Sequence, residues 1–229
     1  MGCWSPLNAM KAYVHTLQLC KDYSDDQTDS NANAGTSKLI EPECVEFISA
    51  LAAGNQSRLM IDVTSDGVSP STLALAIAAR HTNGRLICVC PDRPSLAQAK
   101  SQLQGFGLQD AVDFQIGDPC CVIKQYKNVD FAAVDHRIDN CDEVLFSLDM
   151  NPDGSIVVLS NLFRGGSSSS KRRVGAPNYV HMKKGSYRGR GIESAVLPVG
   201  GGMEVNRFGR ACRSSRQKRS KRTFLVYEE

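Results

Sequence analysis

The strongest constraint on the fold is a strand–helix–strand pattern between Leu59 and Asp92. An apolar run at 59–63 precedes a polar loop, an Ala- and Leu-rich helical segment at 70–80 and a second apolar run at 86–90. Two parallel strands joined by a crossover helix form an α/β unit that binds ligands where the first strand turns into the helix. In dinucleotide sites that turn is rich in glycine, whereas the loop here contains only Gly67.

The same alternation continues along the chain. Further strands are predicted at 112–116, 129–134 and 155–160, and further helices at 94–104, after Pro119 and at 140–148. Five strands alternating with helices predict a parallel sheet that is covered by helices on both faces. Three glycines at 200–202 separate apolar runs at 192–198 and 203–208, which predicts a C-terminal hairpin.

The composition divides the chain into four segments. Residues 1–21 predict an N-terminal helix, because Ser5 is a good N-cap and Pro6 suits the first helical position. Residues 22–38 are polar and acidic, which predicts a flexible linker. The α/β domain is expected at 39–208, with a basic loop insertion at 164–190, and a basic tail at 209–229.

Charge is distributed unevenly. Residues 1–163 contain 11 Lys/Arg and 20 Asp/Glu, whereas residues 164–229 contain 16 and 4. In the loop at 164–190 the cations alternate with Tyr179 and Tyr187, which suits phosphate contacts with base stacking. We expect this loop to contact nucleic acid or an acidic protein; the alternative is a solvated loop without a specific partner.

The nine cysteines lack the paired spacing of a zinc site and are expected to be small buried side chains in a reducing compartment. No apolar run approaches the ~18–20 residues that span a bilayer, so no membrane partner is expected. The expected location is the cytoplasm. The nucleus is the alternative, because the basic run at 216–222 resembles an import signal.

The segment Leu197-Pro198-Val199-Gly200-Gly201-Gly202 resembles the hairpin signature of class I S-adenosylmethionine-dependent methyltransferases, nearest their catechol and caffeoyl-CoA O-methyltransferase branch. This resemblance covers residues 40–208. Trp4-Ser5-Pro6, residues 80–85 and the hairpin are also similar to a plant family of unknown function, described as methyltransferases that use S-adenosylmethionine. The resemblance implies a Rossmann-like, doubly wound, mostly parallel seven-stranded sheet that ends in an antiparallel hairpin.

The resemblance also implies an S-adenosylmethionine site along the strand ends. Asp62 matches the acid that holds the methionine amino group, whereas Thr64, Asp66 and Val68 stand where the family has glycines. Each added Cβ crowds the approach of the backbone to the ligand. The implied donor-side residues are Asp62, Thr64, Ser65, Gly67, Ser71, Cys90, Asp92 and Asp118.

Structural roles compete with several of these assignments. Ser71 belongs to a segment that can be an ordinary capped helix start. Cys90 takes the place of the ribose-binding acid, and Asp92 either reaches the ribose or caps a turn. Asp118 either contacts adenine or begins a turn or helix.

The implied acceptor side consists of Asp135, His136 and Asn161. In the catechol branch the first of these binds a divalent metal together with an Asp-Asn pair, which is Ser160-Asn161 here. Losing one carboxylate weakens a magnesium site, so no tight metal is expected. His136 is a candidate general base, and the alternative is a structural histidine.

Two functions follow from these residues. The first is an S-adenosylmethionine-dependent methyltransferase with an altered cofactor loop and an unidentified acceptor. The second is a non-catalytic descendant, a binding or regulatory protein that contacts RNA or an acidic partner through its basic C-terminal third.

Overall fold

The computed structural model describes residues 4–26, 41–65, 68–163 and 191–209. Its strands are β1 (Leu59–Val63), β2 (Arg85–Cys90), β3 (Val112–Ile116), β4 (Phe131–Asp135), β5 (Ser155–Ser160), β6 (Gly191–Leu197) and β7 (Met203–Gly209). Its helices are α1 (Pro6–Asp26), α2 (Pro42–Gly54), α3 (Pro70–Thr82), α4 (Arg93–Gly105), α5 (Pro119–Ile123) and α6 (Cys141–Ser147), with a short 3-10 turn at Gln109–Ala111.

The strands form one seven-stranded sheet in the order β3-β2-β1-β4-β5-β7-β6. The strands β1 to β5 pair in parallel, whereas β7 runs antiparallel to both β5 and β6. The predicted α/β class, the mostly parallel sheet and the C-terminal antiparallel hairpin are therefore confirmed. The order reverses between β1 and β4, which is where open α/β sheets bind ligands.

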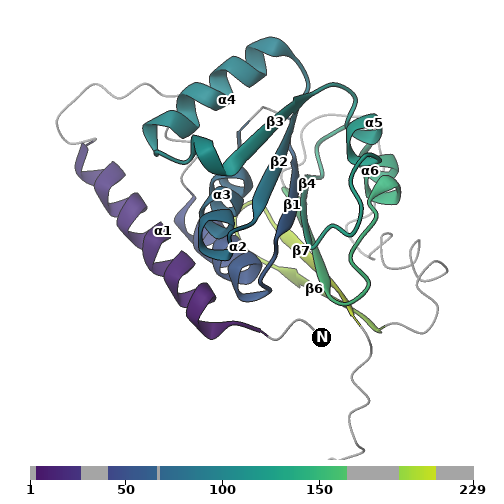
Figure 1. The fold of residues 1–229 in the computed structure, drawn as a ribbon, viewed down its shortest axis with the longest axis horizontal. Helices are drawn as coiled ribbons and strands as arrows, with labels where there is room; N and C mark the ends of the chain where they lie inside the picture. The colour runs from purple at the N-terminus through teal and green to yellow at the C-terminus, as the bar shows by residue number, and fades with distance from the viewer. Residues whose placement is uncertain (1–3, 27–40, 66–67, 164–190, 210–229) are drawn as a thin grey trace, which may run out of the picture.

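Helices cover both faces of this sheet (Figure 1). On one face α2, α3 and α4 pack on the strands, and α1 lies outside α2 and α3. On the other face α5 and α6 cover a second apolar cluster, which includes Ile61, Val134 and Val157. All five residues of β4 are buried, as expected for a strand with neighbours on both sides and helices on both faces.

Helix α3 begins with a capping box. The Ser69 side chain accepts a hydrogen bond from the backbone N–H of Thr72, and the Thr72 hydroxyl accepts one from the backbone N–H of Ser69. Pro70 occupies the first turn, and Asn83 ends the helix with a left-handed φ of 50°. The alanines of α3 are buried and let the helix lie close to the sheet. These local signals position the first turn of α3 beside the end of β1.

Several boundaries differ from the sequence prediction, and at α1 and β4 the structure gives the reason. Helix α1 continues to Asp26, past the expected end at Lys21, because residues 22–26 include no Gly or Pro to stop a helix. Strand β4 begins at Phe131, because Val129 forms only an isolated bridge with Met150. The rest of the predicted linker, the basic loop at 164–190 and the tail from 210 lie outside the described residues.

The turn between β6 and β7 packs against the chain after β5. The backbone N–H groups of Leu162 and Phe163 donate to the carbonyls of Gly202 and Gly201. Gly202 has a φ of +88°, and a Cβ there would meet the Phe163 ring at 2.2 Å, so only glycine fits. In the described part of the chain, no helix is long and apolar enough to cross a membrane.

Candidate functional site

Two carboxyl groups lie at the point where the strand order reverses. Asp62 is the fourth residue of β1 and Asp135 the last residue of β4. In the register Asp62 is level with Ala133 and Val63 with Val134, so the two aspartates are two positions apart. Side chains alternate along a strand, and both carboxyls therefore emerge on the same face, the one covered by α3.

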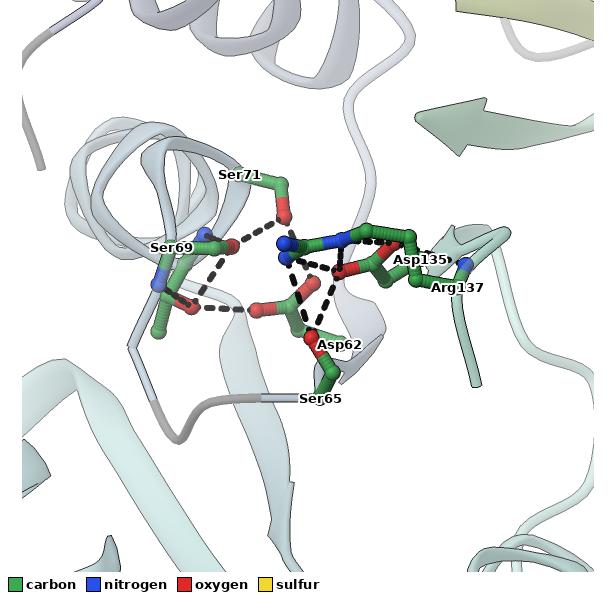
Figure 2. Close-up of polar contacts among 7 residues, drawn as sticks. Asp62, Ser65, Ser69, Ser71, Asp135 and Arg137 are labelled. Carbon is green, nitrogen blue, oxygen red and sulfur yellow. Dashed lines mark hydrogen bonds and ion pairs between the residues drawn. The ribbon is translucent and has the colours of Figure 1, made fainter. Parts of the chain in front are cut away.

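The Asp62 carboxylate is fully buried and hydrogen-bonded to the first turn of α3. One oxygen accepts from the Ser71 hydroxyl at 2.8 Å, and the other accepts from the Thr72 hydroxyl. The Ser69 hydroxyl lies 2.7 Å from that of Ser71 and extends the network to the N-cap (Figure 2). Asp62 therefore ties the end of β1 to the start of α3.

Burial raises the pKa of Asp62 to about 7. The hydrogen bonds from Thr72 and Ser71 favour the ionised form and oppose this shift, whereas the nearby charge of Asp135 adds to it. The cost of burying a charge is thus only partly offset by the two hydroxyl donors. Asp62 changes its ionisation state close to neutral pH.

Asp135 is also buried, but it is paired with a guanidinium. Nε of Arg137 lies 3.1 and 3.0 Å from the two carboxylate oxygens, and Nη2 lies 2.6 Å from one of them. The backbone N–H of Arg137 donates to the other oxygen at 2.9 Å. Burial alone would raise the pKa of Asp135, but the hydrogen bonds and charge of Arg137, with a hydrogen bond to Asn161, outweigh it and lower the pKa below its ordinary value.

Ser65 joins this ion pair to the loop after β1. Its hydroxyl donates to Asp135 at 3.0 Å and accepts from Nη2 of Arg137 at 3.0 Å. Figure 2 shows the Arg137 side chain lying across the space between the two aspartates. The loops that follow β1 and β4 are therefore connected through side chains at the reversal point.

Two further predicted donor-side residues cap helices. Asp92 is the N-cap of α4 and accepts from the backbone N–H of Ser95 at 2.8 Å; Asp118 is the N-cap of α5 and accepts from that of Cys121 at 3.0 Å. Both carboxylates are exposed, and hydrogen bonds to the helix ends lower the pKa of each. Capping is thus established for both, while ligand contact stays a prediction.

The remaining predicted residues that the structure describes are buried or half-buried. Thr64 and Cys90 are buried, and the Cys90 thiol shares a hydrogen bond with Cys88. His136 is half-buried at the end of β4, and its backbone N–H donates to the Ser160 carbonyl. Gly67 and Asp66 lie outside the described residues.

Sequence reasoning missed Arg137 and Thr72. A cation two residues after a strand-ending acid is a local signal that could have identified Arg137, and its own backbone N–H also bonds Asp135. Thr72 follows Ser71 in the first turn of α3, where two successive hydroxyls reach the two oxygens of one carboxylate.

The sequence profile of one protein family matches residues 2–227, which is nearly the whole chain; the family is described as a protein of unknown function, DUF1442. The chain belongs to the DUF1442 family. Among curated proteins, none is significantly similar to this DUF1442 protein in sequence.

Solved structures similar to this DUF1442 protein include methyltransferases. An O-methyltransferase from Bacillus cereus in complex with SAH has a TM-score of 0.57 at 16% identity, covering 86% of this chain and 91% of its own. A methyltransferase from Geobacter sulfurreducens has a TM-score of 0.53 at 18% identity, covering 84% and 89%. A Staphylococcus aureus protein assigned as a caffeoyl-CoA O-methyltransferase has a TM-score of 0.54 at 12% identity, covering 84% and 91%. The fold is therefore that of the S-adenosylmethionine-dependent methyltransferases.

Proposed function

We propose that this DUF1442 protein binds S-adenosylmethionine along the carboxyl edge of its sheet and transfers the methyl group to an acceptor. One observation carries the proposal: each strand from β1 to β4 has an acid within two residues of its carboxyl end, namely Asp62, Asp92, Asp118 and Asp135. The methyltransferase fold of the structural neighbours supports the same assignment.

The exposed acids fit the nucleoside part of the cofactor. Asp92 and Asp118 each give one oxygen to a helix end, and a carboxylate has further lone pairs for hydroxyl or amino donors. Asp62 does not fit the methionine amino group as it stands, because it is buried and both oxygens accept from α3. Its role in the proposal is to fix the first turn of α3 beside the site.

The acceptor side comprises Asp135, His136 and Asn161. When bound, S-adenosylmethionine supplies an electrophilic methyl group, so the residues of the chain mainly orient the acceptor. Asn161 hydrogen-bonds Asp135, which is already held by Arg137, and His136 is the proposed base for the acceptor proton. We propose that this reaction uses no tightly bound metal.

A specific observation favours the second function, a non-catalytic binding protein. Asp62, the acid that matches the amino-group position, is hydrogen-bonded to α3 within the protein. Val68, which stands where class I methyltransferases have a glycine, is buried against the core. In this alternative the chain keeps the sheet and contacts RNA or an acidic protein through residues 164–190.

Isothermal titration with S-adenosylmethionine and with S-adenosylhomocysteine separates the two functions. The first predicts micromolar binding, about −8 kcal/mol, that Asp92→Asn weakens by about tenfold. Asp113→Asn, which changes an exposed carboxylate within β3, is the matched control and should leave the affinity unchanged.

Absence of heat, from folded protein whose melting temperature neither ligand raises, would contradict the methyltransferase proposal. RNA binding whose salt dependence becomes shallower when Lys171, Arg172 and Arg173 are replaced by alanine would then support the alternative.

A further inference from the structure

The Asp135 carboxylate has no capacity left for a metal ion. Its two oxygens offer about four lone-pair sites. They are approached by the backbone N–H of Arg137, by Nε and Nη2 of its guanidinium, and by the Ser65 hydroxyl. Asn161 also hydrogen-bonds this carboxylate. Donors therefore surround the group that would otherwise be the strongest oxygen ligand at this edge.

The geometry of Arg137 resists displacement. A guanidinium that reaches both oxygens of a carboxylate forms short, charge-assisted bonds with defined orientation. Ser65 holds the same guanidinium from the loop after β1, and the Arg137 backbone is itself anchored to the carboxylate. The guanidinium of Arg137 is therefore a covalently attached cation, and contacts from the loops after β1 and β4 hold it in place.

The surrounding ligands are too weak to compete with it. Three side chains with oxygens near the ends of β4 and β5 are neutral, namely Ser65, Ser160 and Asn161, and both oxygens of the nearby Asp62 already accept hydrogen bonds from α3. Magnesium and manganese need carboxylates to bind strongly. In the described part of the chain, no three His, Cys, Asp or Glu side chains are grouped so that they could hold a metal ion.

We propose that Arg137 is the resident cation of this site, a positioning residue that takes the place of a divalent metal on Asp135 and excludes such metals. Asp135 is then oriented by a guanidinium, and the site changes to a metal-binding one when the guanidinium is removed. The positioning of an acceptor by Arg137 rests on the proposed methyltransferase function, whereas the exclusion of metal ions does not.

The test measures Mn²⁺ binding by electron paramagnetic resonance of the free ion, with full-length protein and without any cofactor. Wild type should bind no Mn²⁺ that depends on Asp135. Arg137→Met keeps the aliphatic stem and removes the charge, so it should gain one Mn²⁺ at Asp135, bound at least about tenfold more tightly than any Mn²⁺ that wild type binds elsewhere on its surface. Adding Asp135→Asn to this variant should abolish the gain.

Two further variants keep the result interpretable. Arg137→Lys retains a cation beside Asp135 and should bind Mn²⁺ no better than wild type. Arg85→Met removes an exposed arginine 4.0 Å from Asp113 and is the matched control, for which no gain is expected.

A folded Arg137→Met protein, with wild-type circular dichroism, that gains no Mn²⁺ would overturn the proposal. So would a wild-type Mn²⁺ site that Asp135→Asn removes. Because cofactor binding is titrated separately, failure of the proposed methyltransferase function leaves this outcome readable.

Discussion

At the residue scale, burial and two hydroxyl donors act on the Asp62 carboxyl in opposite directions, and burial prevails. The folded chain holds this proton up to about pH 7, whereas the unfolded chain releases it near 3.8. The folded state therefore binds more protons between these values, so the contribution of Asp62 to the free energy of unfolding is largest below about pH 4 and is lost as pH rises towards 7.

Asp62→Asn should stabilise the protein in alkaline solution, because an amide does not ionise. Its oxygen can still accept a hydrogen bond from a hydroxyl of α3. We expect the variant to gain on the order of 2–3 kcal/mol relative to wild type between pH 5 and pH 8, measured by urea unfolding. The control Asp113→Asn changes an exposed carboxyl. Its free energy of unfolding should differ from that of wild type by the same amount at pH 5 and at pH 8. A variant less stable than wild type at pH 8 would contradict this account.

At the element scale, a histidine pair connects α1 to α3. Nδ1 of His15 on α1 lies 3.2 Å from Nε2 of His81 on α3, and the rings meet edge to face. One ring must accept what the other donates, which two imidazolium ions cannot do. Burial lowers the pKa of both, with Arg80 acting on each and Lys11 on His81.

Acid should therefore loosen α1. Because both folded-state pKa values lie below 6.5, the unfolded chain binds more protons, and the stability from this pair is present above that value and lost as pH falls below it. Trp4, the only tryptophan of the chain, reports on the packing of the start of α1 against α2, because its ring, 49% exposed, lies where a Cβ on Gly54 would be.

We expect Trp4 fluorescence to shift towards that of exposed tryptophan between about pH 7.5 and 5. His81→Gln should reduce this shift, whereas His136→Gln, at the end of β4, should leave it intact. An emission spectrum that is independent of pH in wild type would argue against the histidine pair as the cause.

At the scale of the whole molecule, the protection of backbone amides from hydrogen exchange should decrease from the centre of the sheet to its edge. Strand β4 is buried throughout between β1 and β5, whereas β6 is the last strand and Val196 on it is 57% exposed. Opening of β4 requires loss of both apolar layers, whereas β6 can separate from β7 alone.

Hydrogen exchange followed by mass spectrometry should show amides of β4 exchanging at least about 100-fold more slowly than those of β6. Strand β3, at the opposite edge, is the internal comparison and should be intermediate, because α4 covers one of its faces. Equal rates for β4 and β6 would mean that the hairpin belongs to the cooperative core.

Local patterns were enough to predict most of the fold. Strands β1, β3 and β5 have the bounds expected from apolar runs between turn residues, and the capping signals at Ser69 and Asp92 start helices. These features are readable because each depends on neighbours in the chain. The start of β4 was less readable, since pairing with β1 and β5 decides where that strand begins.

The site required the tertiary structure. The sequence by itself determined an α/β sheet with acids near its strand ends, because hydrophobic alternation and turn chemistry are local. Only the fold decided that Ser65 contacts Arg137, 72 residues further along the chain, and that both oxygens of Asp62 accept hydrogen bonds from α3. Which donors surround a buried carboxylate depends on which loops the strand order brings together, and here the reversal between β1 and β4 makes that choice.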